Sequence, residues 1–256
     1  MTTATASMAG GNRNTRIAVA LAWTGLALAS ACGLAELLAG LGYRWNWWHF
    51  RTGIQIMRWS ASIDLAAVAL TLPAAILAYK NGARSALAVN VAGLVLSLVV
   101  AGPPLYHWRL LDQVPRIHDI STDTDKPPAY VAVLPLRKDA ENSTAYSAEV
   151  AAQQKKAYPD IAPALLDLPP AQAFARAERA ARAMGWEIVA AAPGDLRIEA
   201  TDTTLLFGFK DDIVIRIAAA GNGSRVDLRS LSRVGKSDFG VNAKRIRKFM
   251  QQLSAG

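Results

Sequence analysis

Three long apolar runs in the N-terminal part of the chain constrain its fold most strongly. They extend over residues 17–43, 59–79 and 85–108, and each holds at most one charged side chain. At 1.5 Å per residue, each run is long enough to cross a hydrocarbon core of ~30 Å as a helix. Three such runs in succession argue against a soluble helical bundle. The sequence therefore predicts three transmembrane helices, with Pro103-Pro104 closing the third.

Charge and composition divide the chain further. Residues 1–108 carry seven basic and two acidic side chains, whereas residues 109–256 carry 21 basic and 18 acidic ones and have soluble composition. The basic excess thus lies beside the apolar runs, where it fits lipid headgroups and topology. No nucleic-acid-binding motif occurs, and we expect no nucleic-acid partner. We predict an N-terminal tail (1–16), a membrane domain (17–108) and a soluble domain (109–256).

Basic side chains on the two sides of the runs number four and five, so they do not orient the helices. Aromatic side chains gather around the first connection and at the end of the third run, as they do at one membrane interface. We therefore expect the connection 43–58 to lie along the membrane surface.

Two acids, Glu36 and Asp64, interrupt the apolar runs. Such acids can be buried functional groups, but we expect them near helix ends or paired with a neighbour. Cys32 is the single cysteine, which excludes an intrachain disulfide and a cysteine zinc site. Residues 12–33 also resemble a lipoprotein signal cut at Cys32. The apolar run continues to Leu41, however, which favours an uncleaved helix.

The soluble part shows clear periodicities from residue 169 on. A helix is predicted from Pro169-Pro170 to Gly185 and another from Ser237 or Asp238 to Leu253, with its basic residues on the outer face. Between them, alternation predicts strands over 186–191, 196–201, 212–218 and 225–231. Residues 109–168 are expected to be irregular, with an extended run over 129–136. The predicted fold class is α+β, an antiparallel sheet of about four strands with two helices against one face.

Two acidic segments are candidate reaction centres. One Asp-rich stretch with a histidine could ligate a metal: His118, Asp119, Asp123 and Asp125. Its spacing fits no calcium loop, and such side chains more often bond local backbone amides. Asp211-Asp212 could act in acid/base chemistry, or pair with arginines of a neighbouring strand.

A third segment, residues 229–240, is a candidate anion site. It carries cations where a strand leads through Gly235 into a helix N-terminus, whose amides attract anions. The predicted ligand-binding residues are Arg229, Arg233, Lys236, Ser237, Asp238, Asn242 and Arg245, with Asp211 and Asp212. The alternative is helix capping by Ser237 or Asp238 and pairing of the arginines with the aspartates.

Two motifs, residues 207–213 and 228–246, resemble the signature of the domain of unknown function 1499 family. Residues 118–123 with Pro127-Pro128 resemble a motif of its membrane-anchored bacterial branch. The resemblance covers roughly residues 115–253, and the chain lacks the cysteine-containing motif of the lipoprotein-like branch. Because many members resemble secreted or lipid-anchored proteins, it implies an extracytoplasmic domain. It implies no activity.

The chain is thus expected to be a multi-pass protein of a bacterial inner membrane, with a cytoplasmic N-terminus and a periplasmic domain. Besides the lipid bilayer, that domain would bind a membrane or periplasmic protein, or an anionic ligand. No cofactor and no catalytic residue are predicted. Two other functions stay open: a hydrolase using the soluble carboxylates, and an accessory subunit of a membrane complex.

Overall fold

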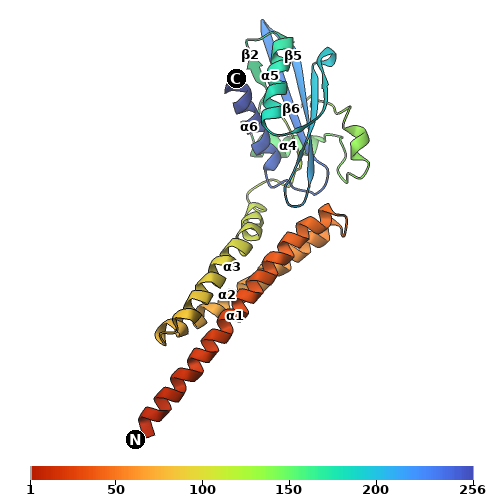
Figure 1. Ribbon diagram of the computed structural model, residues 1–256. Helices are drawn as coiled ribbons and strands as arrows, with labels where there is room; N and C mark the ends of the chain where they lie inside the picture. Colours follow the sequence, from red (N-terminus) through yellow and green to blue (C-terminus); the bar gives the residue numbers. More distant parts are fainter. Residues whose placement is uncertain (1, 256) are drawn as a thin grey trace. The chain divides into compact units, whose positions relative to one another are not determined.

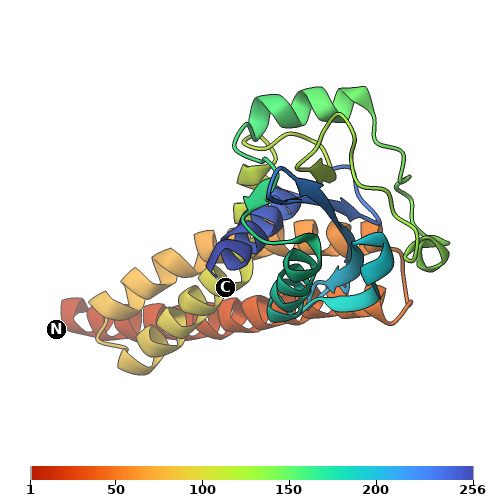
Figure 2. The same ribbon diagram turned by 90° about the horizontal axis from the view of Figure 1, so that it is seen from above.

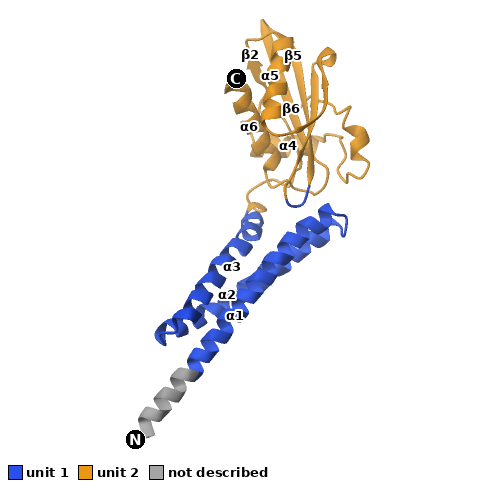
Figure 3. Cartoon of the chain, in the orientation of Figure 1, with its two compact units in different colours: residues 1–109, 206–208 blue, residues 110–205, 209–256 orange. Residues whose placement is uncertain are grey.

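The computed structural model describes residues 2–255, and the side chains of residues 13–255. It divides into two compact units (Figure 3). The helical unit comprises residues 1–109 with 206–208, and the sheet unit comprises residues 110–205 with 209–256.

The helical unit contains three long helices, α1 (Thr2–Arg44), α2 (Phe50–Lys80) and α3 (Arg84–Leu110) (Figures 1 and 2). Arg13–Arg44, Phe50–Lys80 and Arg84–Leu110 are each long and apolar enough to cross a membrane. The prediction of three long apolar helices is therefore confirmed.

Small residues let α1 and α2 approach closely as an antiparallel pair. Buried alanines line both helices, among them Ala39 on α1 and Ala67 on α2. A Cβ atom placed on Gly53 would lie 2.6 Å from the carbonyl oxygen of Ala39, too close for any side chain. Close backbone approach through small residues is the usual packing of apolar helices in membranes.

Two predicted boundaries were wrong. Residues 50–58 do not form a surface-lying connection but the first turns of α2, which starts after His49 accepts a hydrogen bond from the Arg51 amide (3.3 Å). Pro103-Pro104 do not end α3, which continues to Leu110. Proline removes a backbone donor, but its φ of about −65° is helical, so a helix can pass through it.

The sheet unit is built on a six-stranded antiparallel sheet in the order β1-β6-β5-β4-β3, with β2 also paired to β6. The strands are β1 (Asp119–Ser121), β2 (Ala164–Leu166), β3 (Glu187–Ala192), β4 (Arg197–Thr203), β5 (Lys210–Ala220) and β6 (Gly223–Ser232). The four predicted strands correspond to β3–β6. The two short strands β1 and β2 lie in the region predicted to be irregular.

Helices α5 (Pro170–Ala183) and α6 (Val241–Ala255) cover one face of the sheet (Figure 1). Ile213, Ile215 and Ile217 of β5 and Val226 and Leu228 of β6 are buried against them in the main apolar core. This is the predicted α+β class with two helices on one face. A further helix, α4 (Ala148–Ala157), was not predicted; it lies apart from α5 and α6 (Figure 2).

The opposite face of the sheet is not open to solvent. The segment 122–147 covers it and includes a 3-10 turn, η1 (Leu134–Arg137), where an extended run was expected. Tyr130 and Val133 of this segment pack on Val214 and Leu231 of the sheet. We name residues 122–147 the cover segment. Asp227 and Arg229 of β6 lie on this face and are buried beneath the cover segment.

Candidate functional site

Charged side chains are concentrated between the sheet and the cover segment. The strand register places Thr201, Asp212, Leu231 and Asp119 in one row across four strands. The next row on this face is Glu199, Val214, Arg229 and Ser121, followed by Arg197, Arg216 and Asp227. Alternate residues of a strand share a face, so the polar positions of β4–β6 form a single layer.

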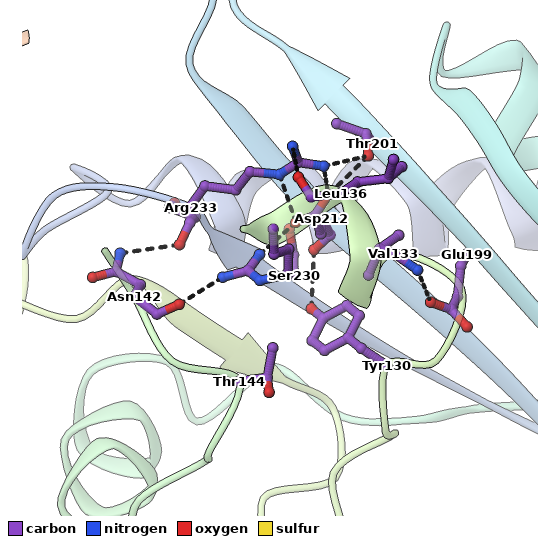
Figure 4. A network of polar contacts seen from close by, with 12 residues as sticks. Tyr130, Val133, Leu136, Asn142, Thr144, Glu199, Thr201, Asp212, Ser230 and Arg233 are labelled. Atoms are coloured by element: carbon purple, nitrogen blue, oxygen red, sulfur yellow. Dashed lines mark hydrogen bonds and ion pairs between the residues drawn. The ribbon is translucent and has the colours of Figure 1, made fainter. Parts of the chain in front are cut away.

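Asp212 is the centre of this layer (Figure 4). Its carboxylate is fully buried and receives Nε (2.9 Å) and Nη2 (2.8 Å) of Arg233, the hydroxyl of Thr201 (2.8 Å) and Nη1 of Arg137. A buried carboxylate is tolerated when charges and hydrogen bonds fill its lone pairs. Asp212 is thus a structural anchor with no oxygen directed at a ligand.

Glu199 holds the backbone of the cover segment. It is fully buried, and its carboxylate accepts hydrogen bonds from the amides of Val131, Ala132 and Val133 at 2.9–3.1 Å. Burial raises the pKa of Tyr130, so its hydroxyl stays protonated and donates to the carbonyl of Asp212 (2.9 Å). Together these bonds fix residues 130–133 on the sheet.

Arg229 forms a second, almost completely enclosed ion pair. Its Nε and Nη2 bond the two oxygens of Asp119 at 2.9 and 2.6 Å, and the rings of Tyr130 and Tyr146 flank it at 5.0 and 5.3 Å. Burial alone would lower the pKa of Arg229, but the carboxylate of Asp119 raises it overall. Nη1 and Nη2 also bond the carbonyls of Pro128 and Thr144, so all three guanidinium nitrogens already have an acceptor within the domain.

A third cluster ties the start of the cover segment to the sheet. The carboxylate of Asp123 accepts hydrogen bonds from Nη2 of Arg216 (3.0 Å) and Nη2 of Arg225 (2.9 Å). Both arginines also donate to the carboxylate of Asp227. The remaining Asp123 oxygen accepts the amides of Asp125 and Lys126. This is the local turn that was weighed against a metal site.

The helix-covered face has a smaller polar cluster around Arg245. This arginine was expected on the outer face of the last helix, but it is buried and bonds Asp202 and Asp211 (2.9 and 2.6 Å). Asn242 receives Nη1 of Arg245 and the hydroxyl of Ser230, and donates to Ser232. An arginine surrounded by two carboxylates and an amide is already neutralised, so it attracts no further anion.

The start of α6 is capped by the chain itself. Asp238 accepts the amides of Gly240 (2.8 Å) and Asn242 (2.9 Å), and Ser237 accepts that of Phe239. The capping carboxylate occupies the amides that a bound anion would use. Lys236 is exposed beside them. The structure therefore brings the predicted ligand-binding residues into two internal networks and a cap, not into one open site.

The four predicted metal ligands are similarly divided. Asp119 faces Arg229, Asp123 faces Arg216 and Arg225, and Asp125 pairs with Lys155 (2.8 Å). Nδ1 of His118 is buried without a hydrogen-bond partner. Across the described residues, no group of three or more His, Cys, Asp or Glu side chains is arranged to hold a metal ion.

Sequence reasoning missed Arg137, Glu199 and Tyr130, three of the residues that attach the cover segment. Only Glu199 carried a signal, as a charged residue within an alternating strand. Tyr130 and Arg137 lie in a segment without periodicity, where no pattern marks a buried partner.

The attached segment presents an apolar tip to solvent. Val131, Leu134 and Leu136 are about half exposed (50%, 46% and 53%), and Pro135 between the leucines is exposed. The backbone beneath them is bound: Arg233 donates to the carbonyl of Leu136 (2.7 Å), and Glu199 holds the amide of Val131. We name Val131, Leu134, Pro135 and Leu136 the apolar tip.

Comparison with known proteins places this domain in a family without assigning an activity. No curated protein matches the chain. One family model matches residues 119–253, from the first residue of β1 almost to the end of α6, and so includes both polar networks and the cover segment. This match spans more than half of the chain, and the chain belongs to the family described as "Protein of unknown function (DUF1499)".

Proposed function

We propose that the protein is a non-enzymatic membrane protein whose sheet unit binds another protein through the apolar tip. The observation that carries this proposal is the attachment of the cover segment by buried ion pairs and hydrogen bonds. The paired carboxylates considered for acid/base chemistry are both engaged in ion pairs: Asp211 with Arg245, and Asp212 with Arg137 and Arg233. A rigid platform that exposes aliphatic side chains suits recognition better than acid/base chemistry.

The chemistry of the tip favours a protein over an anionic ligand or a lipid surface. Apolar anchors on a preorganised backbone lose little entropy on binding and form the core of protein interfaces. The exposed charges that follow the tip are Lys138, Asp139 and Glu141, two acids to one base. An anionic membrane would repel this surface, and the arginines predicted to bind anions are internally paired.

The proposal places the three helices in a bacterial inner membrane, with the N-terminus in the cytoplasm and the sheet unit in the periplasm. Three crossings put the two ends of the helical unit on opposite sides. The resemblance of many family members to secreted or lipid-anchored proteins supports the extracytoplasmic side for the sheet unit. Its partner would then be a periplasmic or membrane protein.

Cysteine labelling tests this placement. Asn222 lies exposed in the β5–β6 turn, so Asn222→Cys in a Cys32→Ala background supplies one accessible thiol. We expect an impermeant maleimide to label it in intact spheroplasts. Asn81→Cys, in the exposed α2–α3 connection, is the matched control and should react only after lysis. The reverse pattern would overturn the periplasmic placement.

Photocrosslinking tests the interaction. A benzophenone side chain at Leu134 or Leu136 should form one and the same protein adduct in living cells. Leu165 is the matched control, because it is an exposed leucine (75%) on β2, outside the apolar tip. The partner found by mass spectrometry should crosslink back to the tip from its own surface. Equal adducts from Leu165, adducts with lipid only, or adducts with a second copy would each overturn the proposal.

A further inference from the structure

The helical unit contains an acid at the centre of its second helix. Asp64 lies 14 residues after Phe50 and 16 residues before Lys80, the ends of α2. At 1.5 Å per residue, it is roughly 20 Å from either end, near the middle of a span that can cross a membrane. Asp64 was expected to lie near a helix end or to pair with a neighbour. It does not lie near an end, because α2 begins nine residues before the predicted start, but it does hydrogen-bond a side chain of α3.

The three helices enclose this acid. Asp64 is fully buried, and its Oδ1 accepts a hydrogen bond from the hydroxyl of Ser97 (2.9 Å). Ser97 is itself the central residue of α3, 13 residues from both Arg84 and Leu110. The hydrogen bond therefore joins the middle of one span to the middle of another.

The second oxygen of Asp64 has no partner. Oδ2 is buried without a hydrogen bond, and so is Oε1 of Glu36 on α1. The two carboxyl groups are close enough to interact electrostatically, and Cys32 lies within range of both. The titratable groups facing Asp64 from α1 are thus Cys32 and Glu36, while α3 contributes the hydroxyl of Ser97.

No basic side chain of the described helices neutralises this pair. Arg58, the nearest base along α2, precedes Asp64 by six residues, is exposed, and lies about 240° around the axis at 100° per residue. An ionised carboxylate at the centre of a bilayer is costly, because no water solvates its charge there. Two ionised carboxylates in one helical unit without a cation would cost more than one, and a bound proton removes a charge.

We propose that Asp64 and Glu36, with Ser97 as hydroxyl donor, form a proton-binding site inside the helical unit. The step is the addition of one proton from hydronium to a carboxylate oxygen, which releases water and moves no electron. A metal ion fits less well, since hard cations take six or more oxygen ligands and no metal-binding group occurs among the described residues. Intramembrane acids of this kind mark proton pathways. The inference rests on the proposed membrane insertion.

Infrared spectroscopy tests the site on the full chain reconstituted in lipid vesicles. A protonated carboxyl absorbs separately from a carboxylate, and we expect a carboxylic acid band at pH 7. Asp64→Asn keeps the size and the acceptor for Ser97 but cannot hold the proton, so the band should be lost or reduced, as with Glu36→Gln. Ser97→Ala should shift its frequency without removing it. Thr71→Val is the matched control, because that buried hydroxyl bonds its own helix (3.0 Å).

Three results would overturn the site: no band at pH 7, a band unchanged in both acid variants, or a band displaced by sodium or potassium at constant pH. Alkaline extraction of the same membranes separates this failure from failure of the proposed function. A chain that stays in the membrane without the band refutes the acid site alone. A chain released by the alkaline wash refutes membrane insertion and the acid site together.

Discussion

Single charged residues in the sheet unit determine how its two layers are held together. Arg229, Asp212 and Glu199 lie on the face that strand alternation assigns to solvent, yet each is almost completely buried. Arg229 and Asp212 bond both the cover segment and neighbouring parts of the sheet, and Glu199 bonds the backbone amides of the cover segment. On the face under the cover segment, therefore, ion pairs and charged hydrogen bonds hold the two layers together. On the face under α5 and α6, apolar side chains do so.

Arg229→Ala should destabilise the protein strongly. It would leave the carboxylate of Asp119 buried without its cation, a change that costs about 3–5 kcal/mol. Arg182→Ala is the control, since its exposed pair with Glu178 on α5 is worth only about 0.3–0.5 kcal/mol. Urea unfolding of the full chain in detergent, followed by circular dichroism, measures both. Equal effects of the two substitutions would contradict the structural role of Arg229.

Asp123 makes the stability depend on acid pH. Burial alone would raise the pKa of its carboxyl, but bonds from the Lys126 amide, Arg216 and the Asp125 amide, with the charge of Arg225, lower it overall. Below the ordinary value of about 3.9, the unfolded chain then binds more protons than the folded one. The stabilisation is present above about pH 4 and is lost as the pH falls through the lowered folded pKa.

Asp123→Asn should therefore flatten the loss of stability in this acid range and lower stability at pH 7. Unfolding free energies of the two proteins, measured by urea titration from pH 3 to 7, show the difference. A variant whose acid dependence matches that of the wild type would mean that Asp123 keeps its ordinary pKa.

At the level of elements, the strands and helices with a regular sequence pattern could be predicted. The segment that covers the second face of the sheet could not. Alternation over residues 225–231 gives Val226 and Leu228 the same face of the strand, and both are buried in the main apolar core. Alternation could not show what lies against the other face. A period of two indicates which residues of a strand share a side, but not which other segment packs on that side. The cover segment is attached by contacts between side chains and backbone distant in sequence, such as Glu199 to Val131–Val133. Such contacts leave no local pattern.

The same limit applies to the candidate site. One alternative from the sequence was pairing of the arginines with the aspartates, and Arg233 does pair with Asp212. The sequence did not indicate that Arg229 would pair with Asp119, which lies 110 residues away along the chain. In the helical unit, the start of α2 was predicted too late, because the aromatic side chains among residues 45–59 suggested a connection at the membrane interface. That error moved Asp64 from the centre of its helix to an end.

The α1–α2 pair offers a prediction about helix packing. Gly53→Ala would put a Cβ against the Ala39 carbonyl, which is backbone and cannot yield without moving the helix, so we expect a loss of about 1–3 kcal/mol. Gly102→Ala on α3 is the control: its Cβ meets no atom within 4 Å. The gain from a less flexible unfolded chain is offset because a residue with a Cβ before Pro103 is disfavoured in a helix, so we expect a smaller effect. Unfolding by sodium dodecyl sulfate in mixed micelles compares them. A neutral Gly53→Ala would contradict close α1–α2 contact.

At the scale of the whole molecule, the two units rely on different stabilising forces. The helical unit is built from apolar helices whose packing depends on small residues. The sheet unit has its own apolar core, including Ile213, Leu228 and Phe249, each fully buried, and a polar layer on the opposite face. A domain with its own core and satisfied polar groups has what it needs to fold alone.

The fragment 110–256 should accordingly fold without the helical unit. It contains a single tryptophan, Trp186, which is buried and stacked on Phe249 of α6 at 5.5 Å. This pair joins residues 63 positions apart, so it forms only when the core is folded. We expect the fluorescence of Trp186 to be blue-shifted in the native fragment and to move to longer wavelength in one cooperative transition with urea. Phe249→Ala, the matched variant, should unfold at lower urea, as large-to-small core changes cost about 3–5 kcal/mol. In the full chain in detergent, the sheet unit should unfold at a lower urea concentration than the three long helices. The detergent keeps covering the apolar surface of these helices, so urea has little new surface of theirs to solvate. A fragment without a cooperative transition would mean that the sheet unit needs the membrane helices to fold, and the two units would then have to be treated as one.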